Sequence, residues 1–257
     1  MENRITSLLN RKDKKIVSIY FTAGYPELSD TQQIISELEK NGVDLIEIGI
    51  PFSDPVADGV VIQQSSEAAL KNGMTIHLLF EQLKEIRKSI SIPLILMGYL
   101  NPVMQYGVEK FCARCREIGI DGTILPDLPL DVYEAEYKEI FERNSLSNIF
   151  LITPQTPEAR IRKIDNLSTG FIYMVSSSST TGMKESGDDA QIAYFERIRD
   201  MKLKSKLLIG FGISDKKSFE RASTYANGAI IGSAFVLALK GESTIENKVG
   251  TFIQKFF

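Results

Sequence analysis

Apolar residues in this chain gather in short runs, separated by stretches with a helical pattern. The segment at residues 30–42, for example, has an apolar stripe at helical spacing, with Asp30 as a candidate N-cap and Gly42 just past its end. Eight runs are rich in β-branched and other apolar side chains, which is typical of buried strands. They read KIVSIYF, DLIEIGI, IPLILMGY, DGTILPDL, NIFLITP, GFIYMVSS, KLLIGFG and GAIIGSA. The pattern therefore predicts strands and helices that alternate along the whole chain.

This alternation predicts one α/β domain, a (β/α)8 TIM barrel that spans residues 1–257. Nearly continuous apolar strands with crossover helices favour a parallel sheet covered by helices, and eight units of about 32 residues match such a barrel. A doubly wound open sheet is the alternative, but it usually has fewer strands at this length. Residues 2–10 predict an extra N-terminal helix at the bottom of the barrel.

The charge and the termini narrow the class of protein. The chain has 30 Lys and Arg against 33 Asp and Glu, with no basic stripe for nucleic acid or an anionic membrane. The N-terminus lacks the apolar core of a signal peptide, and no apolar stretch approaches the roughly 18 residues of a membrane helix. We therefore expect a cytoplasmic protein that binds neither nucleic acid nor membrane.

Two cysteines, Cys112 and Cys115, have the spacing of some zinc and redox motifs. A zinc site needs further ligands, whereas the only histidine is His77, and the cysteines lie within a helical pattern. We expect both cysteines to be small apolar residues on one face of a helix, and we expect no metal site.

An acidic residue stands inside the second apolar run, DLIEIGI. In a barrel strand, alternation places Leu45, Glu47 and Gly49 toward the interior and the three isoleucines toward the helices. A carboxylate buried without a partner is costly, so its pKa should rise, which suits a group that carries a proton in catalysis. The alternative is a structural glutamate that is paired or hydrogen-bonded within the core.

The loop that follows, PFSDPVADG at residues 51–59, contains Asp54 and Asp58. Either aspartate can be an ordinary turn or N-cap residue, the commonest role of Asp beside Pro and Gly. The loop is long enough to fold over the mouth of the barrel, where catalytic residues of this fold lie. Asp58 would then face Glu47, and two carboxylates in different environments supply an acid and a base near neutral pH.

Glycine-containing turns follow the last two strands, in IGFGIS and GAIIGSA. This is the usual position of a phosphate site in a barrel, and we expect its backbone donors at Gly212, Gly232 and Ser233. Simple tight turns are the alternative. The long polar loop SSSSTTGMKESGDD suits either a lid or an unstructured connection, and its Thr181 and Gly182 are candidates for the same phosphate.

The chain lacks some common catalytic groups. No lysine lies in the interior or the C-terminal half of a predicted strand, which argues against a Schiff-base aldolase, and one histidine cannot build the usual catalytic metal site. Two carboxylates, a phosphate cradle and an apolar pocket remain, so bond cleavage must use the substrate as its electron sink. The residues expected to line the pocket are Tyr20, Tyr99, Ile62, Leu125 and Tyr173.

Five segments closely resemble the tryptophan synthase alpha subunit family. They are IEIGIPFSDPVADG, LMGYLNPV, DGTILPDLP, IGFGIS and GAIIGSA. The first is highly specific, whereas the glycine motifs occur in many phosphate-binding barrels, and the likeness runs from Arg4 to the C-terminus. The resemblance implies a (β/α)8 barrel that cleaves indole-3-glycerol phosphate by a retro-aldol reaction, which yields indole and glyceraldehyde 3-phosphate.

The resemblance also implies the roles of individual residues. The residue that matches Glu47 handles the proton at C3 of the indole and the side-chain hydroxyl. The residue that matches Asp58 hydrogen-bonds the indole N–H and stabilises its developing positive charge. Tyr173 matches a family tyrosine beside these two. The glycerol phosphate is expected at Gly182, Gly212, Gly232 and Ser233.

A partner is implied as well, namely a beta subunit that holds pyridoxal phosphate and receives indole through a tunnel in an α2β2 complex. No cofactor is expected in this chain itself. Pro51, Asp54 and Pro55 match the loop that contacts the beta subunit. One segment departs from the family. Where many members have Ser-Arg-x-Gly-Val-Thr-Gly, this chain has serine at all four positions of 176–179. The resemblance therefore does not imply how that loop closes or whether it helps to bind the phosphate.

Two other functions compete with this interpretation. One is another phosphate-binding barrel enzyme of the same pathway, such as an indole-glycerol-phosphate synthase or a phosphoribosyl isomerase. The synthase would need a strand-end lysine, which is missing. The other is a barrel without catalysis that only activates or scaffolds a beta subunit, and the presence of both Glu47 and Asp58 argues against it.

Overall fold

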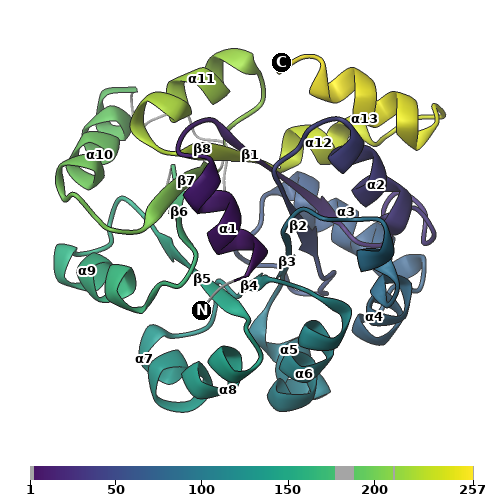
Figure 1. Ribbon diagram of the computed structural model, residues 1–257. Helices are drawn as coiled ribbons and strands as arrows, with labels where there is room; N and C mark the ends of the chain where they lie inside the picture. Colours follow the sequence, from purple (N-terminus) through teal and green to yellow (C-terminus); the bar gives the residue numbers. More distant parts are fainter. Residues whose placement is uncertain (1–2, 177–187, 211, 257) are drawn as a thin grey trace.

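Eight parallel strands close into a barrel in the order of the chain, with β8 paired to β1 (Figure 1). The computed structural model describes residues 3–176, 188–210 and 212–256. The strands are β1 (Ile16–Thr22), β2 (Leu45–Gly49), β3 (Leu94–Met97), β4 (Gly122–Ile124), β5 (Ser147–Ile152), β6 (Phe171–Val175), β7 (Lys206–Gly210) and β8 (Gly228–Ile231). The predicted TIM barrel is thus confirmed, and the open sheet is wrong.

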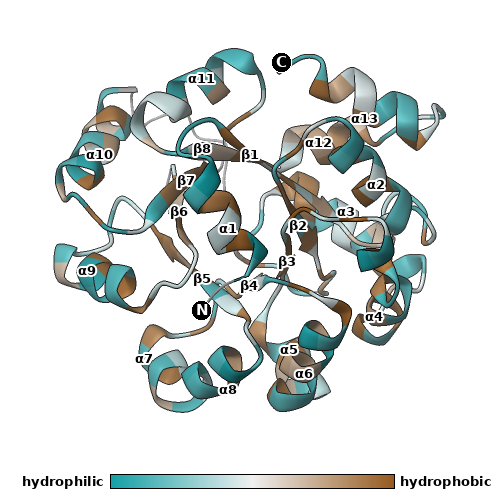
Figure 2. Ribbon diagram, viewed as in Figure 1, coloured by the Kyte–Doolittle hydropathy of each residue, from teal (hydrophilic) through white to brown (hydrophobic). Residues whose placement is uncertain are grey.

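Helices cover the outside of the barrel and, in the case of the first helix, one of its ends, and they turn their polar faces outward (Figure 2). They are α1 (Arg4–Arg11), α2 (Thr31–Lys40), α3 (Val60–Lys71), α4 (Ile76–Leu83), α5 (Leu100–Tyr106), α6 (Val108–Ile118), α7 (Leu130–Val132), α8 (Lys138–Arg143), α9 (Glu158–Leu167), α10 (Asp188–Asp200), α11 (Lys216–Tyr225), α12 (Ser233–Ala238) and α13 (Ile245–Ile253). A short 3-10 helix η1 (Ile86–Lys88) precedes β3, and a π-helical segment η2 (Tyr133–Tyr137) joins α7 to α8.

The core has two parts, as alternation along the strands requires. Inside the barrel, Leu45 packs with other inward-facing strand residues, whereas Ile46 and Ile48 belong to the cluster between strands and helices. Glu47 is paired with Tyr20 in the register of β1 and β2, so both lie on the inner face. The predicted direction of the side chains on β2 is confirmed.

The helix α1 crosses one end of the barrel, where Figure 1 shows it at the centre of the ring. Asn3 and Thr6 form a capping box at its start, and its apolar stripe of Ile5, Leu8 and Leu9 is buried against the inner strand residues. Fully burying such side chains contributes about 1.5–3 kcal/mol each. The predicted N-terminal helix is therefore confirmed, although it runs from residue 4 to 11 rather than from 2 to 10.

One predicted detail is wrong. Asp30 precedes α2, but its side chain makes no capping hydrogen bond with the helix. Its backbone is already helical, with φ −77° and ψ −16°, whereas a capping residue normally has an extended backbone. The carboxylate accepts a hydrogen bond from the N–H of Glu27 instead. Gly42 does follow the helix, with a left-handed φ of +82°.

Cys112 and Cys115 are both buried in α6 as free thiols, and burial raises the pKa of each. Within the described ranges, no group of three or more His, Cys, Asp or Glu side chains is arranged to hold a metal ion. None of the helices in the described part of the chain combines the length and apolar character that a membrane crossing requires.

Candidate active site

A cavity of about 400 Å³ lies at the carboxyl ends of the strands, the face on which barrel enzymes carry their active sites. Its walls come from strand ends, from the loop before α3 and the first turn of that helix, from the loop after β7 and from α12. The lining residues are Tyr20, Glu47, Asp58, Gly59, Ile62, Met97, Tyr173, Gly212, Ile213, Ser214, Ile230, Gly232, Ser233, Ala234 and Leu237. Both candidate carboxylates therefore face one cavity that is largely apolar.

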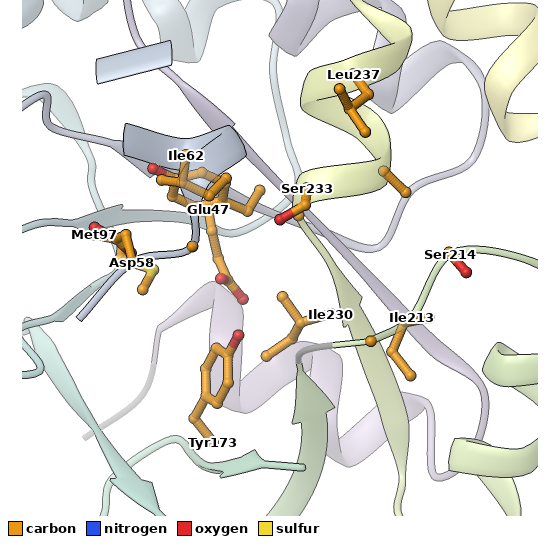
Figure 3. Close-up of a pocket in the computed structure, with 15 residues that line it drawn as sticks. Glu47, Asp58, Ile62, Met97, Tyr173, Ile213, Ser214, Ile230, Ser233 and Leu237 are labelled. Carbon is orange, nitrogen blue, oxygen red and sulfur yellow. The ribbon is translucent and has the colours of Figure 1, made fainter. Parts of the chain in front are cut away.

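Glu47 is fully buried in β2. The hydroxyl of Ser18 donates a hydrogen bond of 2.8 Å to Oε1, whereas Oε2 has no hydrogen-bond partner among the described residues. Burial without a cationic partner raises the pKa of this carboxyl to about 8, and the hydrogen bond from Ser18 only partly opposes the shift. In Figure 3 the carboxyl of Glu47 and the hydroxyl of Tyr173 point toward one another.

Asp58 reaches the same cavity from the loop between β2 and α3. It is partly buried, and the hydroxyl of Tyr99 donates a hydrogen bond of 3.0 Å to its Oδ2. Burial raises the pKa of Asp58 to about 6, and the bond from Tyr99 acts in the opposite direction. Near neutral pH the cavity therefore holds a protonated Glu47 beside a mostly ionised Asp58, an acid and a charged acceptor.

Tyr99 fixes the loop that carries Asp58. The same hydroxyl that donates to Asp58 accepts a hydrogen bond of 3.0 Å from the N–H of Ala57, and the ring stacks on Phe52 with centroids 5.1 Å apart. Tyr99 lines a smaller adjoining cavity rather than the main one, although Asp58 and Tyr20 border both. Sequence reasoning missed this positioning contact, because it assigned Tyr99 to the wall of the pocket.

The side chains of Tyr20 and Tyr173 occupy the space beside two glycines, Gly49 and Gly210, inside the barrel. A Cβ at Gly49 would lie 2.3 Å from the hydroxyl oxygen of Tyr20, and one at Gly210 would lie 2.1 Å from that of Tyr173. No side chain fits at such distances, so both positions require glycine to admit the rings. Burial raises the pKa of both tyrosines far above the usual value, so both remain neutral hydroxyl groups.

Backbone groups and small side chains form the end of the cavity near β7 and β8. Gly212 has a left-handed φ of +74°, and Gly232 precedes α12, which begins at Ser233. The first N–H groups of a helix have no acceptor within it, so they are free to bind an anion. Among the described lining residues there is no Lys, Arg or His.

The remaining predicted residues are distributed as follows. Leu125 is buried in the outer cluster and does not line the cavity. Pro51 is buried, while Asp54 is exposed and Pro55 is half-buried in the loop before Asp58. Thr181 and Gly182 lie outside the described residues.

Several lining residues were not predicted from the sequence. They are Gly59, Met97, Ile213, Ser214, Ile230, Ala234 and Leu237. Strand alternation contains a signal for two of them, because Met97 lies two residues after Ile95 on β3 and Ile230 lies two residues after Gly228 on β8, and both pack in the inner cluster. The residues on α12 depend on how that helix meets the barrel, which no local pattern reports.

Comparison with known proteins shows the family of this chain. The family model described as Tryptophan synthase alpha chain matches residues 6–255. A tryptophan synthase alpha chain from Flavobacterium johnsoniae is 62% identical over 250 residues, which cover 96% of this chain and 98% of that protein.

Solved structures show the same relationship. A tryptophan synthase alpha chain from Legionella pneumophila matches with a TM-score of 0.87 and 32% identity, covering 100% of this chain and 96% of that one. A chain from M. tuberculosis tryptophan synthase in an aminoacrylate-bound form matches with a TM-score of 0.86 and 26% identity, covering 99% and 98%.

Proposed function

This chain belongs to the tryptophan synthase alpha chain family and is thus an indole-3-glycerol-phosphate lyase of tryptophan biosynthesis, and we propose that Glu47 and Asp58 perform its chemistry. One observation carries this assignment. Two carboxyl groups, with pKa values raised to about 8 and about 6, line one cavity of about 400 Å³. The apolar wall of this cavity suits an indole ring, and its glycine-rich end suits a phosphate.

In the first step, protonated Glu47 donates its proton to C3 of the indole ring. Positive charge then develops at the ring nitrogen, and the carboxylate of Asp58 accepts a hydrogen bond from the indole N–H and stabilises that charge. The raised pKa of Glu47 supports this role, because the proton is present at neutral pH. Its Oε2 has no partner among the described residues and so is available to the substrate.

In the second step, the hydroxyl on the side-chain carbon next to the ring gives its proton to the Glu47 carboxylate. The C–O bond becomes a carbonyl, the carbon-carbon bond breaks, and its electrons neutralise the charged ring. The products are indole and glyceraldehyde 3-phosphate, and Glu47 has regained its proton. Because the protonated ring accepts the electrons, neither a lysine nor a cofactor is needed in this chain.

The phosphate group is assigned to Gly212, Gly232 and Ser233 at the glycine-rich end of the cavity. Backbone N–H groups bind a phosphate without bulky side chains, and such binding would hold the reacting carbon between the two carboxyl groups. Tyr20, Ile62 and Tyr173 would contact the indole ring. Thr181 and Gly182 remain candidates from the loop after β6.

We also propose a beta subunit as the partner, in an α2β2 complex in which that subunit carries pyridoxal phosphate. The loop with Pro51, Asp54 and Pro55 would contact it. Two exposed apolar side chains support the assignment, because Val56 on this loop is 83% exposed and Val60, the first residue of α3, is 64% exposed. Asp58 lies on the same loop and is held by Tyr99 together with Ala57, so a partner that contacts the loop would influence catalysis through Asp58.

The pH dependence of indole release tests the assignment of the two carboxyl groups. The active form needs ionised Asp58 and protonated Glu47, so kcat/KM should rise through about pH 6 and fall through about pH 8. The assay measures free indole from indole-3-glycerol phosphate, with and without a beta subunit. A profile that stays flat from pH 5 to 9 would contradict the proposed roles.

A further inference from the structure

The described residues at the proposed phosphate site carry no positive charge. Among the described residues that line the cavity, none is basic, although a phosphate monoester carries nearly two negative charges at neutral pH. Backbone dipoles compensate only part of such a charge. A cation close behind the lining residues would therefore increase the affinity for the substrate.

A small second cavity lies directly behind Gly212 and Ile213, which border both cavities. Its other side is formed by α10, by α11 and by Ser176 just after β6. Arg221 on α11 is the only basic residue among its described lining residues. The two helices lie side by side in Figure 1, so one side chain can reach across from α11 to α10.

The guanidinium of Arg221 is held by a short series of hydrogen bonds. Its Nη2 donates to Oε1 of Gln191 at 2.7 Å, and Nε2 of Gln191 donates to the carbonyl of Ser176 at 3.3 Å. The two bonds fix the orientation of the Gln191 side-chain amide, because its oxygen must accept from the arginine and its nitrogen must donate to the carbonyl. A single amide group thus separates the positive charge from the backbone at Ser176.

Ser176 in turn lies against the proposed phosphate site. Its N–H donates to the carbonyl of Gly210 at 3.2 Å, and its hydroxyl lies 3.9 Å from the position that a Cβ on Gly212 would occupy. The series Arg221–Gln191–Ser176 therefore connects a fixed positive charge to the backbone beside Gly212.

We propose that Arg221 strengthens the binding of the phosphate group of the substrate, as a positioning residue whose charge Gln191 holds behind Gly212. The inference rests on the proposed phosphate site. Arg221 does not line the cavity that holds Glu47 and Asp58, so it acts on binding and not on the proton transfers.

The test measures binding of glycerol 3-phosphate to the full chain by calorimetry, so that no catalysis is required. Arg221→Gln should weaken binding about five-fold at low salt, the order expected for one charge acting on a dianion through screened surroundings. The difference should shrink at high salt. Arg221→Lys, which keeps the charge, should retain most of the affinity.

Arg199→Gln is the matched control, because it removes an exposed arginine at the far end of α10 and should leave binding unchanged. With indole-3-glycerol phosphate, Arg221→Gln should raise KM by a similar factor and leave kcat within two-fold. Thermal unfolding of each variant reports whether the fold is intact.

The outcomes separate this inference from the proposed function. Gly232→Asp, which places a negative charge at the phosphate site, should abolish binding of glycerol 3-phosphate. If it does and Arg221→Gln binds like the wild type, Arg221 has no such role. Equal losses in the Lys and Gln variants of Arg221 would also overturn the inference, because charge would not be the cause. Unchanged binding by Gly232→Asp would reject the phosphate site itself.

Discussion

Replacing Glu47 with glutamine should make the protein more stable and nearly inactive at the same time. Glutamine has almost the same shape, carries no charge and keeps an acceptor for the hydroxyl of Ser18. It cannot carry a proton between the substrate atoms, however. Because proton transfer by a positioned side chain contributes about 10²–10⁴-fold to the rate, kcat should fall at least 100-fold.

The stability change follows from the pKa of the carboxyl group. Burial raises the pKa of Glu47 from 4.5 to about 8, so within this interval the folded chain keeps a proton that the unfolded chain has lost. The stability that depends on protonated Glu47 is therefore fully present below pH 4.5 and is lost as pH rises through about 8. Between these two pKa values, the free energy of unfolding falls by about 1.4 kcal/mol for each pH unit. From pH 4.5 to pH 7 the loss is therefore about 3 kcal/mol.

Urea unfolding at several pH values measures this difference. Relative to the wild type, Glu47→Gln should gain about 1 kcal/mol at pH 5, about 3 kcal/mol at pH 7 and about 5 kcal/mol at pH 9. Glu67→Gln is the control, because Glu67 is exposed on α3 and forms a surface ion pair with Lys71. A gain that does not change with pH, or a variant that retains more than a tenth of kcat, would refute the reasoning.

Two further substitutions test the second carboxyl group. Asp58→Asn should lower kcat at least 100-fold while KM changes less than five-fold, because Asp58 stabilises charge that exists only during reaction. Steady-state measurement of indole release gives both constants. A rise in KM as large as the fall in kcat would contradict that role. Tyr99→Phe removes the hydroxyl that stabilises ionised Asp58, so the acidic limb of kcat/KM should move above about pH 6. An unchanged limb would show that Tyr99 does not control this ionisation, and Tyr106→Phe serves as a control outside the cavity.

The sequence by itself determined the repeating architecture and the inner face of β2. Periodicity decides this much, because an apolar strand that alternates with amphipathic helices buries its surface in only a few ways. Glu47 could be identified as an interior carboxyl because its direction depends only on its place within one strand. Its raised pKa was expected for the same reason, because a carboxyl group that faces the barrel interior is removed from solvent and its charged form is disfavoured.

The tertiary structure alone decided the contacts between distant segments. Asp58 lies in a loop without periodicity, and its orientation depends on the hydroxyl of Tyr99, which is 41 residues further along the chain. Arg221 and Gln191 are ordinary surface residues in the sequence, and only the packing of α11 beside α10 brings them together behind Gly212. A local pattern specifies which face of an element is buried, whereas the partners across that face are set only when the barrel closes.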